Sequence, residues 1–266
     1  MRNFTEWSQT SLGQSLLMAE QNALAQFLPA LKGDIAIQYS YAGTSPMLEM
    51  SEIDHKFFLL VRENGHAQSA QPVSDDPLAH LQSLYVEPDS VLPLSSSSVD
   101  LCLLPHMLDY SADPHHLLRE SKDILVSGGH LVILGFNPYS LWGGRKLFSR
   151  KKTPWNSHNF SVYRVREWLS LLDFHISGGM MLYYSPPIQR QSLRERFVFL
   201  EHAGDRWWPM LGSVYMLIAQ KREPGMTVID FRQNIRKSSF LNIAEPAAKN
   251  TINTKSYTTV CSDYLY

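Results

Sequence analysis

Short apolar runs of strand length alternate along this chain with segments whose apolar residues recur at helical spacing. Four of these runs stand out: KFFLLV at 56–61, VDLCLL at 99–104, HLVILGF at 130–136 and SVYMLIAQ at 213–220. Continuous apolar runs are typical of strands that are buried on both faces, as the strands of parallel sheets are. Strands that alternate with helices predict an α/β domain around a mostly parallel sheet.

The first helix is expected directly before the first strand. The segment at 11–33, SLGQSLLMAEQNALAQFLPALKG, carries an apolar stripe at helical spacing. Ser11 and Gln14 have the spacing of a capping box at its start. Pro29 is expected to kink or end the helix, and Gly33 to stop it.

A second helix is predicted to begin at Asp113-Pro114. Aspartate fits the N-cap, and proline fits the first turn, where its missing amide costs nothing. We expect Gly128-Gly129 to end this helix before the HLVILGF strand. The remaining predicted elements are strands at 34–39, 84–86 and 175–184, a short helix near 78–81 and a helix within 161–174.

The predicted elements suggest an organisation in three parts. An N-terminal helical segment at 1–33 precedes a domain at 34–222, which carries insertions near 138–160 and 186–212. Beyond this domain the chain becomes polar and weakly patterned. We therefore expect residues 223–266 to form a peripheral, partly disordered tail.

Composition and charge argue against several classes of protein. The formal net charge is −1, so no global field would recruit nucleic acid or an anionic membrane. Cys102 lies in an apolar run and Cys261 in the polar tail, which does not suggest a disulfide framework. The apolar runs are far shorter than the roughly 20 residues that span a bilayer, and the N-terminus lacks a signal-peptide pattern. We expect a cytoplasmic protein without a membrane span.

The middle of the chain has the pattern of a known family. A Pro93-Leu94 pair precedes a strand that begins with Val99-Asp100, and a helix of the type P-x-x-x-L-x-E runs from Pro114 to Glu120. A glycine-bounded turn and the HLVILGF strand follow. This order resembles the second half of a class I S-adenosylmethionine-dependent methyltransferase domain, and the match in order extends over roughly residues 34 to 220. The segments FNPYSLWGGRKLF and RWWPMLGSVYMLIAQKR more narrowly resemble a bacterial branch of uncharacterised methyltransferase-like proteins.

The resemblance implies a fold and a cofactor. The fold is a Rossmann-like, seven-stranded, mostly parallel sheet with helices on both faces and an antiparallel last strand. The cofactor is S-adenosylmethionine, which would bind where open parallel sheets bind ligands, outside the carboxyl ends of the strands at the switch point. The cofactor-binding residues that it implies are Tyr39, Ser40, Gly43, Glu63, Asp89, Ser90, Leu104 and His106.

Several of these assignments have a plain structural alternative. Glu63 is the candidate acceptor for the ribose hydroxyls, or else a solvated loop acid. Asp89 and Ser90 would meet adenine, or else form an ordinary turn. His106 is a candidate catalytic base, or else a packed and hydrogen-bonded histidine. Asp100 we expect to have a structural role at the start of its strand.

The stretch DIAIQYSYAGTSPML at 34–48 departs from the family pattern. Family members carry an acidic residue and closely spaced glycines here, whereas this chain has Gln38, Tyr39, Ser40 and Tyr41. Gly43 could still supply one turn. Side chains at these positions would crowd the methionine part of the cofactor, so this loop decides whether the cofactor binds.

The two insertions hold the candidate substrate residues, Tyr139, Trp142 and Trp207. One insertion also holds a basic segment with interleaved aromatics. It could be a solvated face, a nucleic-acid contact or a site for an anionic small molecule. This segment contains Arg145, Lys146, Arg150, Lys151 and Lys152. His115 and His116 are adjacent and lack the spacing of metal ligands, so we predict no metal site.

Three functions follow from these features. The first is a methyltransferase acting on a small-molecule substrate. The second is a catalytically silent methyltransferase-like protein that serves in binding or interaction. The third is an RNA or DNA methyltransferase that uses the basic segment. Methyl transfer needs mainly alignment of nucleophile and methyl group, so the lack of an obvious catalytic residue is compatible with the first.

Overall fold

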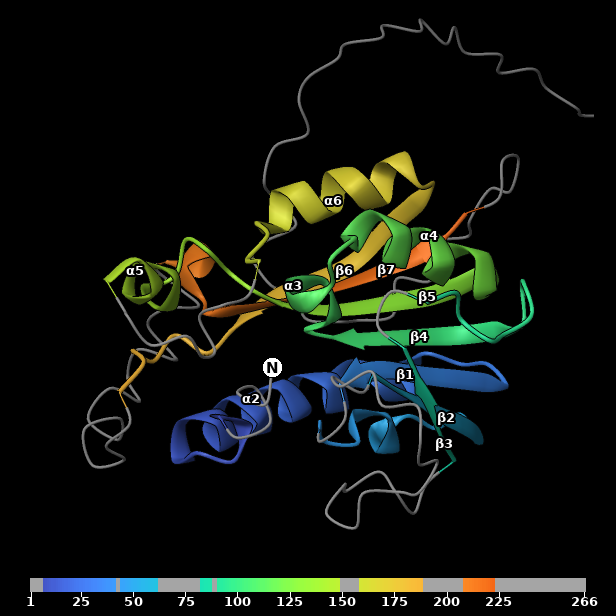
Figure 1. The fold of residues 1–266 in the computed structure, drawn as a ribbon, viewed down its shortest axis with the longest axis horizontal. Coiled ribbons are helices and arrows are strands. Elements are labelled where there is room, and N and C mark those ends of the chain that lie inside the picture. Colours follow the sequence, from blue (N-terminus) through green and yellow to red (C-terminus); the bar gives the residue numbers. More distant parts are fainter. Residues whose placement is uncertain are drawn as a thin grey trace, which may run out of the picture.

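A seven-stranded sheet forms the centre of the protein in its computed structural model (Figure 1). The structure describes residues 7–41, 44–61, 82–87, 90–148, 158–188 and 208–222. The strand order is β3-β2-β1-β4-β5-β7-β6. The strands are β1 (Ile35–Tyr41), β2 (His55–Val61), β3 (Ser83–Val86), β4 (Val99–Pro105), β5 (Leu125–Phe136), β6 (Phe174–Leu182) and β7 (Val214–Lys221).

The first five strands pair in parallel, whereas β7 runs antiparallel to both β5 and β6. The predicted fold class, with its antiparallel last strand, is therefore confirmed. Because β1 lies between β2 and β4, the order reverses there, and the switch point falls between the carboxyl ends of β1 and β4.

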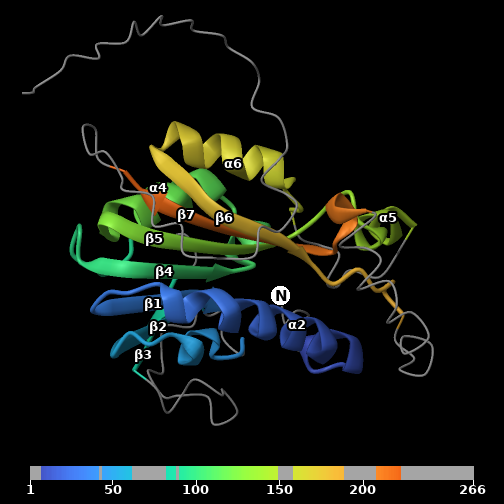
Figure 2. The same ribbon diagram turned by 180° about the vertical axis from the view of Figure 1, so that it is seen from behind.

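Helices cover both faces of the sheet. The helical elements are α2 (Ser11–Phe27), η1 (Leu28–Ala30), η2 (Met47–Met50), α3 (Met107–Tyr110), α4 (Pro114–Ile124), α5 (Leu141–Phe148), α6 (Val162–Leu171) and η3 (Pro209–Leu211). Helices α3 and α4 lie in front of the sheet in Figure 1, and α2 lies in front of it in Figure 2. No described helix is both long and apolar enough to cross a bilayer.

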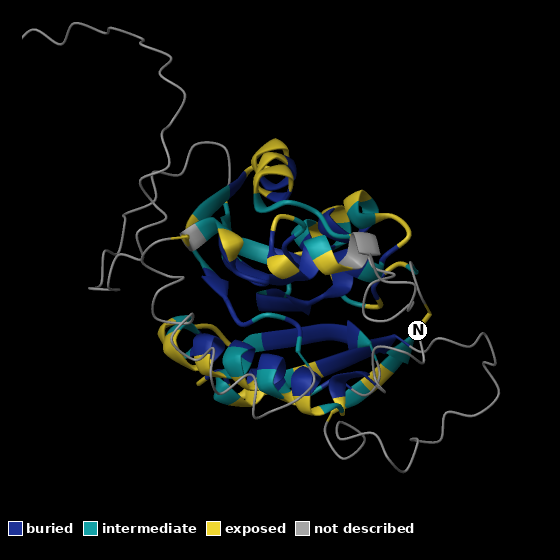
Figure 3. Cartoon of the chain, turned by 90° about the vertical axis from the view of Figure 1, so that its left-hand side faces the viewer, coloured by how far each residue is buried: buried dark blue, intermediate teal, exposed yellow. Residues whose placement is uncertain are grey.

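Each buried strand contributes alternate residues to the two cores. Along β4, Leu101 and Leu103 pack with α2 and η2, whereas Cys102 and Leu104 pack with α3, α4 and α6. This alternation follows from the two-residue period of a strand, and both sets are apolar because helices cover both faces. The buried residues accordingly gather on the strands between the helical layers (Figure 3).

The start of α2 differs from the predicted capping box. The N-cap is Thr10, whose hydroxyl accepts a hydrogen bond from the Gly13 amide at 3.2 Å. Ser11 is already the first helical residue, so the prediction was one residue too late. The helix ends at Phe27, where Pro29 follows within the 3₁₀ turn η1, as proline chemistry predicts.

Gly128 and Gly129 do not end a helix, contrary to the prediction. Helix α4 begins at Pro114 with Asp113 as N-cap, as predicted, but ends at Ile124, and β5 starts at the next residue. The two glycines lie in an irregular part of β5, where the register with β4 shifts. Gly128 has a φ of 80°, which a glycine adopts without a steric penalty. The glycines therefore bend the strand instead of separating two elements.

The connection from β1 to β2 contains the short 3₁₀ turn η2 among its described residues. A parallel crossover usually carries a full helix. Here α2 packs against η1 and η2 and supplies much of the apolar cover on that face. Asp100 ties the neighbouring strands together, because its Oδ2 accepts hydrogen bonds from the Asp34 and Ile35 amides. This confirms its predicted structural role.

Several predictions fall outside the described residues. They concern the short helix near 78–81, Cys261, the basic side chains at 146 and 150–152, and the tail at 223–266. The division into an N-terminal segment, a domain with insertions and a tail stays a prediction.

Candidate functional site

The carboxyl ends of the parallel strands form one edge of the sheet, and five of the eight expected cofactor residues lie there. Tyr39 and Ser40 belong to the last part of β1, and Leu104 to the end of β4. His106 directly follows β4, and Ser90 lies in the loop after β3. Outside the described residues lie Gly43, Glu63, Asp89 and the candidate substrate residue Trp207.

In the middle of β1, the side chain of Gln38 is engaged by the chain itself. Its Oε1 accepts hydrogen bonds from the amides of Met47, at 2.8 Å, and Leu48, at 3.3 Å. Its Nε2 donates to the carbonyl of Ser45 at 2.9 Å. Gln38 is fully buried, so these bonds fix the turn into η2. An amide both donates and accepts, which a carboxylate in the same place could not do.

A Gln38→Leu variant is expected to lose about 2 kcal/mol of unfolding free energy, because two buried backbone amides lose their acceptor. Urea denaturation at pH 7 would measure this. Gln26→Leu, at an exposed position of α2, is the matched control and should change stability by no more than about 0.5 kcal/mol. Equal stability of the two variants would show that Gln38 does not hold the turn.

On the face of the sheet opposite the Gln38 side chain, near the same edge, two of the expected cofactor residues lie together. Tyr39 and Ser90 line one small cleft, whose wall continues through Met107, Ser111 and Glu120. Oε2 of Glu120 accepts a hydrogen bond from the Leu92 amide at 3.1 Å and so anchors the loop after β3. The cleft thus joins a phenol ring, hydroxyl groups and an apolar wall at the carboxyl ends of β1, β3 and β4.

A buried cluster of three titratable side chains crosses the same edge. Nε2 of His106 lies 2.8 Å from Oε1 of Glu20 in α2, and its Nδ1 lies 3.1 Å from Oδ2 of Asp109 in α3. All three side chains are at most 2% exposed. Oδ2 of Asp109 also accepts from the amide of Phe136, whose ring stacks on the imidazole at 4.2 Å. The cluster therefore links the helix on one face to the helix on the other.

The electrostatics of this cluster decide the protonation of His106. Burial alone would lower its pKa, but the charges of Glu20 and Asp109 and the hydrogen bonds to both raise the pKa to about 9. His106 is therefore an imidazolium at neutral pH, and both its nitrogens are donors. An imidazolium with both N–H groups engaged cannot accept a proton, which argues against His106 as a catalytic base. Two carboxylates and one imidazolium leave the cluster with a formal charge of −1.

Tyr215 of β7 borders the cluster. Its hydroxyl is buried, and burial together with the charge of Asp109 raises its pKa well above the usual value. It has no hydrogen-bond partner among the described residues, and the same holds for Oε2 of Glu20. Gly135 makes room for the phenol, because a Cβ there would lie 2.4 Å from the hydroxyl oxygen.

The two described substrate candidates lie in contrasting environments. Tyr139 is 67% exposed, in the turn between β5 and α5. Trp142 is only 2% exposed, its Nε1 donates to the carbonyl of Ser185 at 3.0 Å, and its ring meets Trp7 edge to face. Trp142 thus has the contacts of a core residue. The structure offers Tyr139, but not Trp142, as a surface for a ligand.

The adjacent histidines have separate neighbours. His115 lies against the ring of Trp168 at 4.2 Å, and Nε2 of His116 is 3.8 Å from Oε1 of Glu120. In the part of the chain that the structure describes, no group of three or more His, Cys, Asp or Glu side chains is arranged so that it could hold a metal ion.

Sequence reasoning missed Glu20, Asp109 and Asn137. Glu20 lies four residues after Leu16 and four before Leu24, so it interrupts the apolar stripe of α2, and this spacing was a usable signal. No comparable signal marks Asn137, whose Nδ2 donates to the carbonyls of Met210 and Gly212 and holds η3 against the end of β5.

Comparison with known families and structures agrees with this geometry. Residues 60–133 match the model of a methyltransferase domain. The matched segment begins at the end of β2, so the β1 loop lies outside it, and it runs through β3 and β4 into β5.

A curated relative from Escherichia coli strain K12, an uncharacterized protein named YafS, is 37% identical over 151 residues. The match covers 55% of this chain and 58% of the relative, so the chain spans less than two thirds of that protein's length.

Solved structures share the fold at low sequence identity. A chain of the Haloferax volcanii complex that contains the Trm112 methyltransferase activator has a TM-score of 0.57 at 16% identity, over 85% of this chain and 99% of that one. An S-adenosylmethionine-dependent methyltransferase from Thermotoga maritima has a TM-score of 0.54 at 15% identity, over 82% and 94%. The [4+2]-cyclase SpnF has a TM-score of 0.52 at 14% identity, over 82% and 84%.

The fold by itself does not decide the chemistry, since one of these structures is a cyclase. Residues 60–133 are similar to a methyltransferase domain, and the strand order and the switch point between β1 and β4 are those of the class I methyltransferase fold.

Proposed function

We propose that this protein is an S-adenosylmethionine-dependent methyltransferase that acts on a small molecule. The observation that carries the proposal is the position of the family match. Residues 60–133 include the carboxyl ends of β2, β3 and β4, so the part of the chain that resembles methyltransferases is the part that forms the ligand-binding edge.

Some residues at this edge fit the groups of the cofactor. Tyr39 and Ser90 offer an aromatic wall and a hydroxyl of the kind that adenine requires, but their cleft holds only about 10 Å³, so adenine binding requires the cleft to widen. Asp89 and Glu63 remain the proposed partners of the adenine and of the ribose hydroxyls. The end of β1 fits less well, because Gln38 is committed to η2 and Ser40 is fully buried. Close backbone approach in this region depends on the segment around Gly43.

The charge of the buried cluster favours the same cofactor. S-adenosylmethionine supplies a methyl group on a positively charged sulfur. Glu20, His106 and Asp109 carry a formal charge of −1 at the edge, which stabilises a cation nearby. In this proposal the three residues act as fixed charges and as supports of the edge, and proton transfer is left to other groups or to the substrate itself.

The rival function is a silent binding protein on the same fold. Its specific support is the hydrogen bonding of Gln38 to the segment that leads into η2. This segment packs against β1 and leaves less space there for a ligand. The net charge of −1 offers no support for a nucleic-acid substrate. Cofactor binding separates the two functions directly.

Calorimetric titration is expected to show one molecule of S-adenosylmethionine bound per chain, more tightly than S-adenosylhomocysteine, because the product lacks the positive charge. Ser90→Phe should weaken binding at least about tenfold by filling the cleft. Ser96→Phe, exposed in a nearby loop, is the matched control and should bind like the wild type. Absence of binding up to about millimolar cofactor would reject the enzyme in favour of the silent protein.

A further inference from the structure

A pocket lies between α6 and the edge of the sheet, away from the Tyr39 cleft. Val162, Tyr163 and Arg166 of α6 form one wall, and β6 and β7 form the opposite wall. Met210 of η3 and Met181, near the end of β6, close one end. Asn137 holds the Met210 carbonyl beside the end of β5, so this end of the pocket reaches the ligand-binding edge of the sheet.

The pocket exists because Gly179 of β6 has no side chain, whereas Ile176 and Met181 on the same face of the strand do. Ile176, Gly179 and Met181 pair with residues of β7 that face α6, and a register shift before Gly178 keeps them on one face. A Cβ at Gly179 would lie 3.0 Å from Cδ2 of Leu217, within the pocket wall. Gly178 faces the other side, where a Cβ would meet Ile218 at 3.8 Å.

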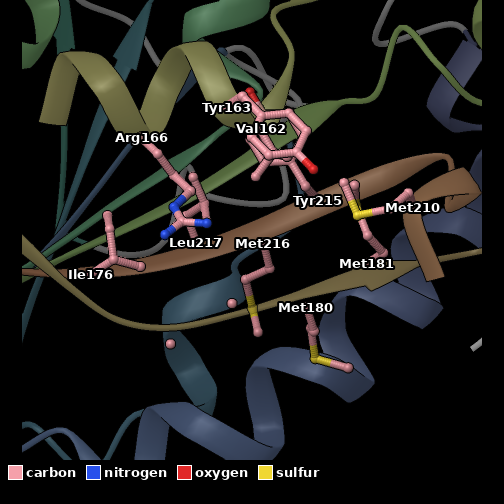
Figure 4. A pocket seen from close by; sticks show the side chains of 12 residues that line it. Val162, Tyr163, Arg166, Ile176, Met180, Met181, Met210, Tyr215, Met216 and Leu217 are labelled. Carbon is pink, nitrogen blue, oxygen red and sulfur yellow. The ribbon is translucent and has the colours of Figure 1, made fainter. Parts of the chain in front are cut away.

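Figure 4 shows the same division between the two faces. The side chains of Met180 and Met216 point from the strands away from α6, toward the opposite side of the sheet. These two residues therefore contribute backbone to the pocket, whereas Met181 and Met210 lie on the side of α6. The four methionines provide two probes inside the pocket and two outside it.

The chemistry of the wall is apolar with one cation. None of the lining residues is acidic, and apart from the two tyrosines and Arg166 their side chains are aliphatic, thioether or absent. Arg166 is exposed and makes no hydrogen bond or ion pair with another described residue. A guanidinium at the mouth of an apolar pocket selects an anionic head on an apolar body.

Size restricts the ligand further. The cavity volume is about 90 Å³. An apolar cavity of about 150 Å³ is known to accept benzene, so this pocket holds a short alkyl segment and excludes a fused ring system. A ligand that extends from the open mouth would keep its polar part beside Arg166.

We infer that this pocket binds the short alkyl segment of an anionic small molecule, with Arg166 at its anionic group. The pocket reaches the edge at which the cofactor is proposed to bind. If the chain is the methyltransferase proposed above, on which this last step rests, the bound molecule is the methyl acceptor, and the acceptor class is a short-chain carboxylate or phosphate.

The test is a titration of protein labelled with ¹³C at the methionine methyl groups, with hexanoate as the probe. The Met181 and Met210 signals are expected to shift in a saturable manner with a Kd of about 1 to 10 mM, while those of Met180 and Met216 stay in place. Hexanol should produce the same pattern more weakly, and hexylammonium more weakly still, because only hexanoate can pair with Arg166.

Matched variants separate the charge from the cavity. Arg166→Gln should weaken hexanoate binding about two- to fivefold and leave hexanol binding unchanged. Gly179→Ala should weaken binding of both at least about threefold, whereas Gly178→Ala, its neighbour on the other face, should leave both unchanged. Val162→Phe narrows the pocket from α6 and should act like Gly179→Ala, which covers the case in which the glycine variant does not fold.

The inference is wrong if about 50 mM hexanoate, several times the expected Kd, leaves the Met181 and Met210 signals unmoved. It is also wrong if Met180 and Met216 shift equally, since binding would then be nonspecific. Equal affinities for hexanoate and hexylammonium would overturn the role of Arg166. The titration contains no cofactor, so its failure and a failure to bind S-adenosylmethionine are distinguishable.

Discussion

A His106→Asn variant is expected to unfold with about 3 to 5 kcal/mol less free energy than the wild type at pH 7. The imidazolium bridges two carboxylates that lie in the protein interior, and asparagine is too short to reach both. Its removal leaves two buried negative charges without a cation. Asparagine is the appropriate replacement because His106 has a φ of 55°, a conformation that asparagine tolerates better than most residues. The measured loss then reports the charges and not backbone strain.

His55→Asn is the matched control for this experiment. His55 is exposed at the start of β2, and the same substitution there should change stability by no more than about 0.5 kcal/mol. Urea denaturation of both variants gives the two values. A loss below about 1 kcal/mol at His106 would mean that Glu20 and Asp109 are neutral in the wild type, and the charge of −1 assigned to the cluster would be wrong.

Much of the fold could be predicted because local chemistry and tertiary structure agree. The runs that became β2, β4 and β5 are apolar on both faces, and the sheet is covered on both faces. Asp113-Pro114 starts α4 because cap chemistry is local. Gly128-Gly129 was misassigned because glycines fit both a helix end and an irregular strand, and only the pairing with β4 separates the two.

The candidate site could be predicted less completely because its contacts are distant in sequence. Glu20 and His106 are 86 residues apart, and although Glu20 interrupts the apolar stripe of α2, nothing in either segment identifies the partner in the other. Trp142 was a candidate substrate residue because aromatic residues are interleaved with basic ones in a predicted insertion. It is buried because Trp7 and Phe136 provide an aromatic environment for its ring. Tyr39 and Ser90 were correctly expected in the same region, because Tyr39 lies near the carboxyl end of β1 and Ser90 lies just beyond that of β3, and these ends meet at one edge of a parallel sheet.

The stretch at 34–48 shows how a fold can persist without a family motif. Gln38 supplies hydrogen bonds to a turn that lacks closely spaced glycines, so the chain leaves β1 with its buried amides satisfied. Strand β1 itself pairs with β2 over seven residues and does not depend on the motif. Fold and cofactor binding are therefore separate questions for this chain, and the Gln38→Leu variant and the cofactor titration address them separately.

The stability that His106 contributes is expected to decline as pH rises from about 6.5 to about 9. The pKa of this histidine is raised from 6.5 to about 9 in the folded state. A raised pKa means that the folded protein holds the proton more tightly than the unfolded chain, so the contribution is complete below 6.5 and is lost as pH passes 9. The total change is about 3 kcal/mol. At each pH, the unfolding free energy of His106→Asn is subtracted from that of the wild type. This cancels most contributions from groups that titrate alike in the two proteins.

Three other buried groups titrate outside this window in the folded protein, and the subtraction cancels their titration in the unfolded chain. Burial and Asp109 raise the pKa of Tyr215 well above its usual value, burial raises that of Cys102 to about 12, and burial lowers that of His130. A decline between 6.5 and 9 in the difference between wild type and variant therefore belongs to His106. Glu20→Gln removes one of the two charges that raise the pKa, so its decline should still begin near pH 6.5 but end at lower pH. A difference that stays constant from pH 6 to 9.5 would show that His106 is neutral in the folded protein, and His106 would then again be available to accept a proton at the ligand-binding edge.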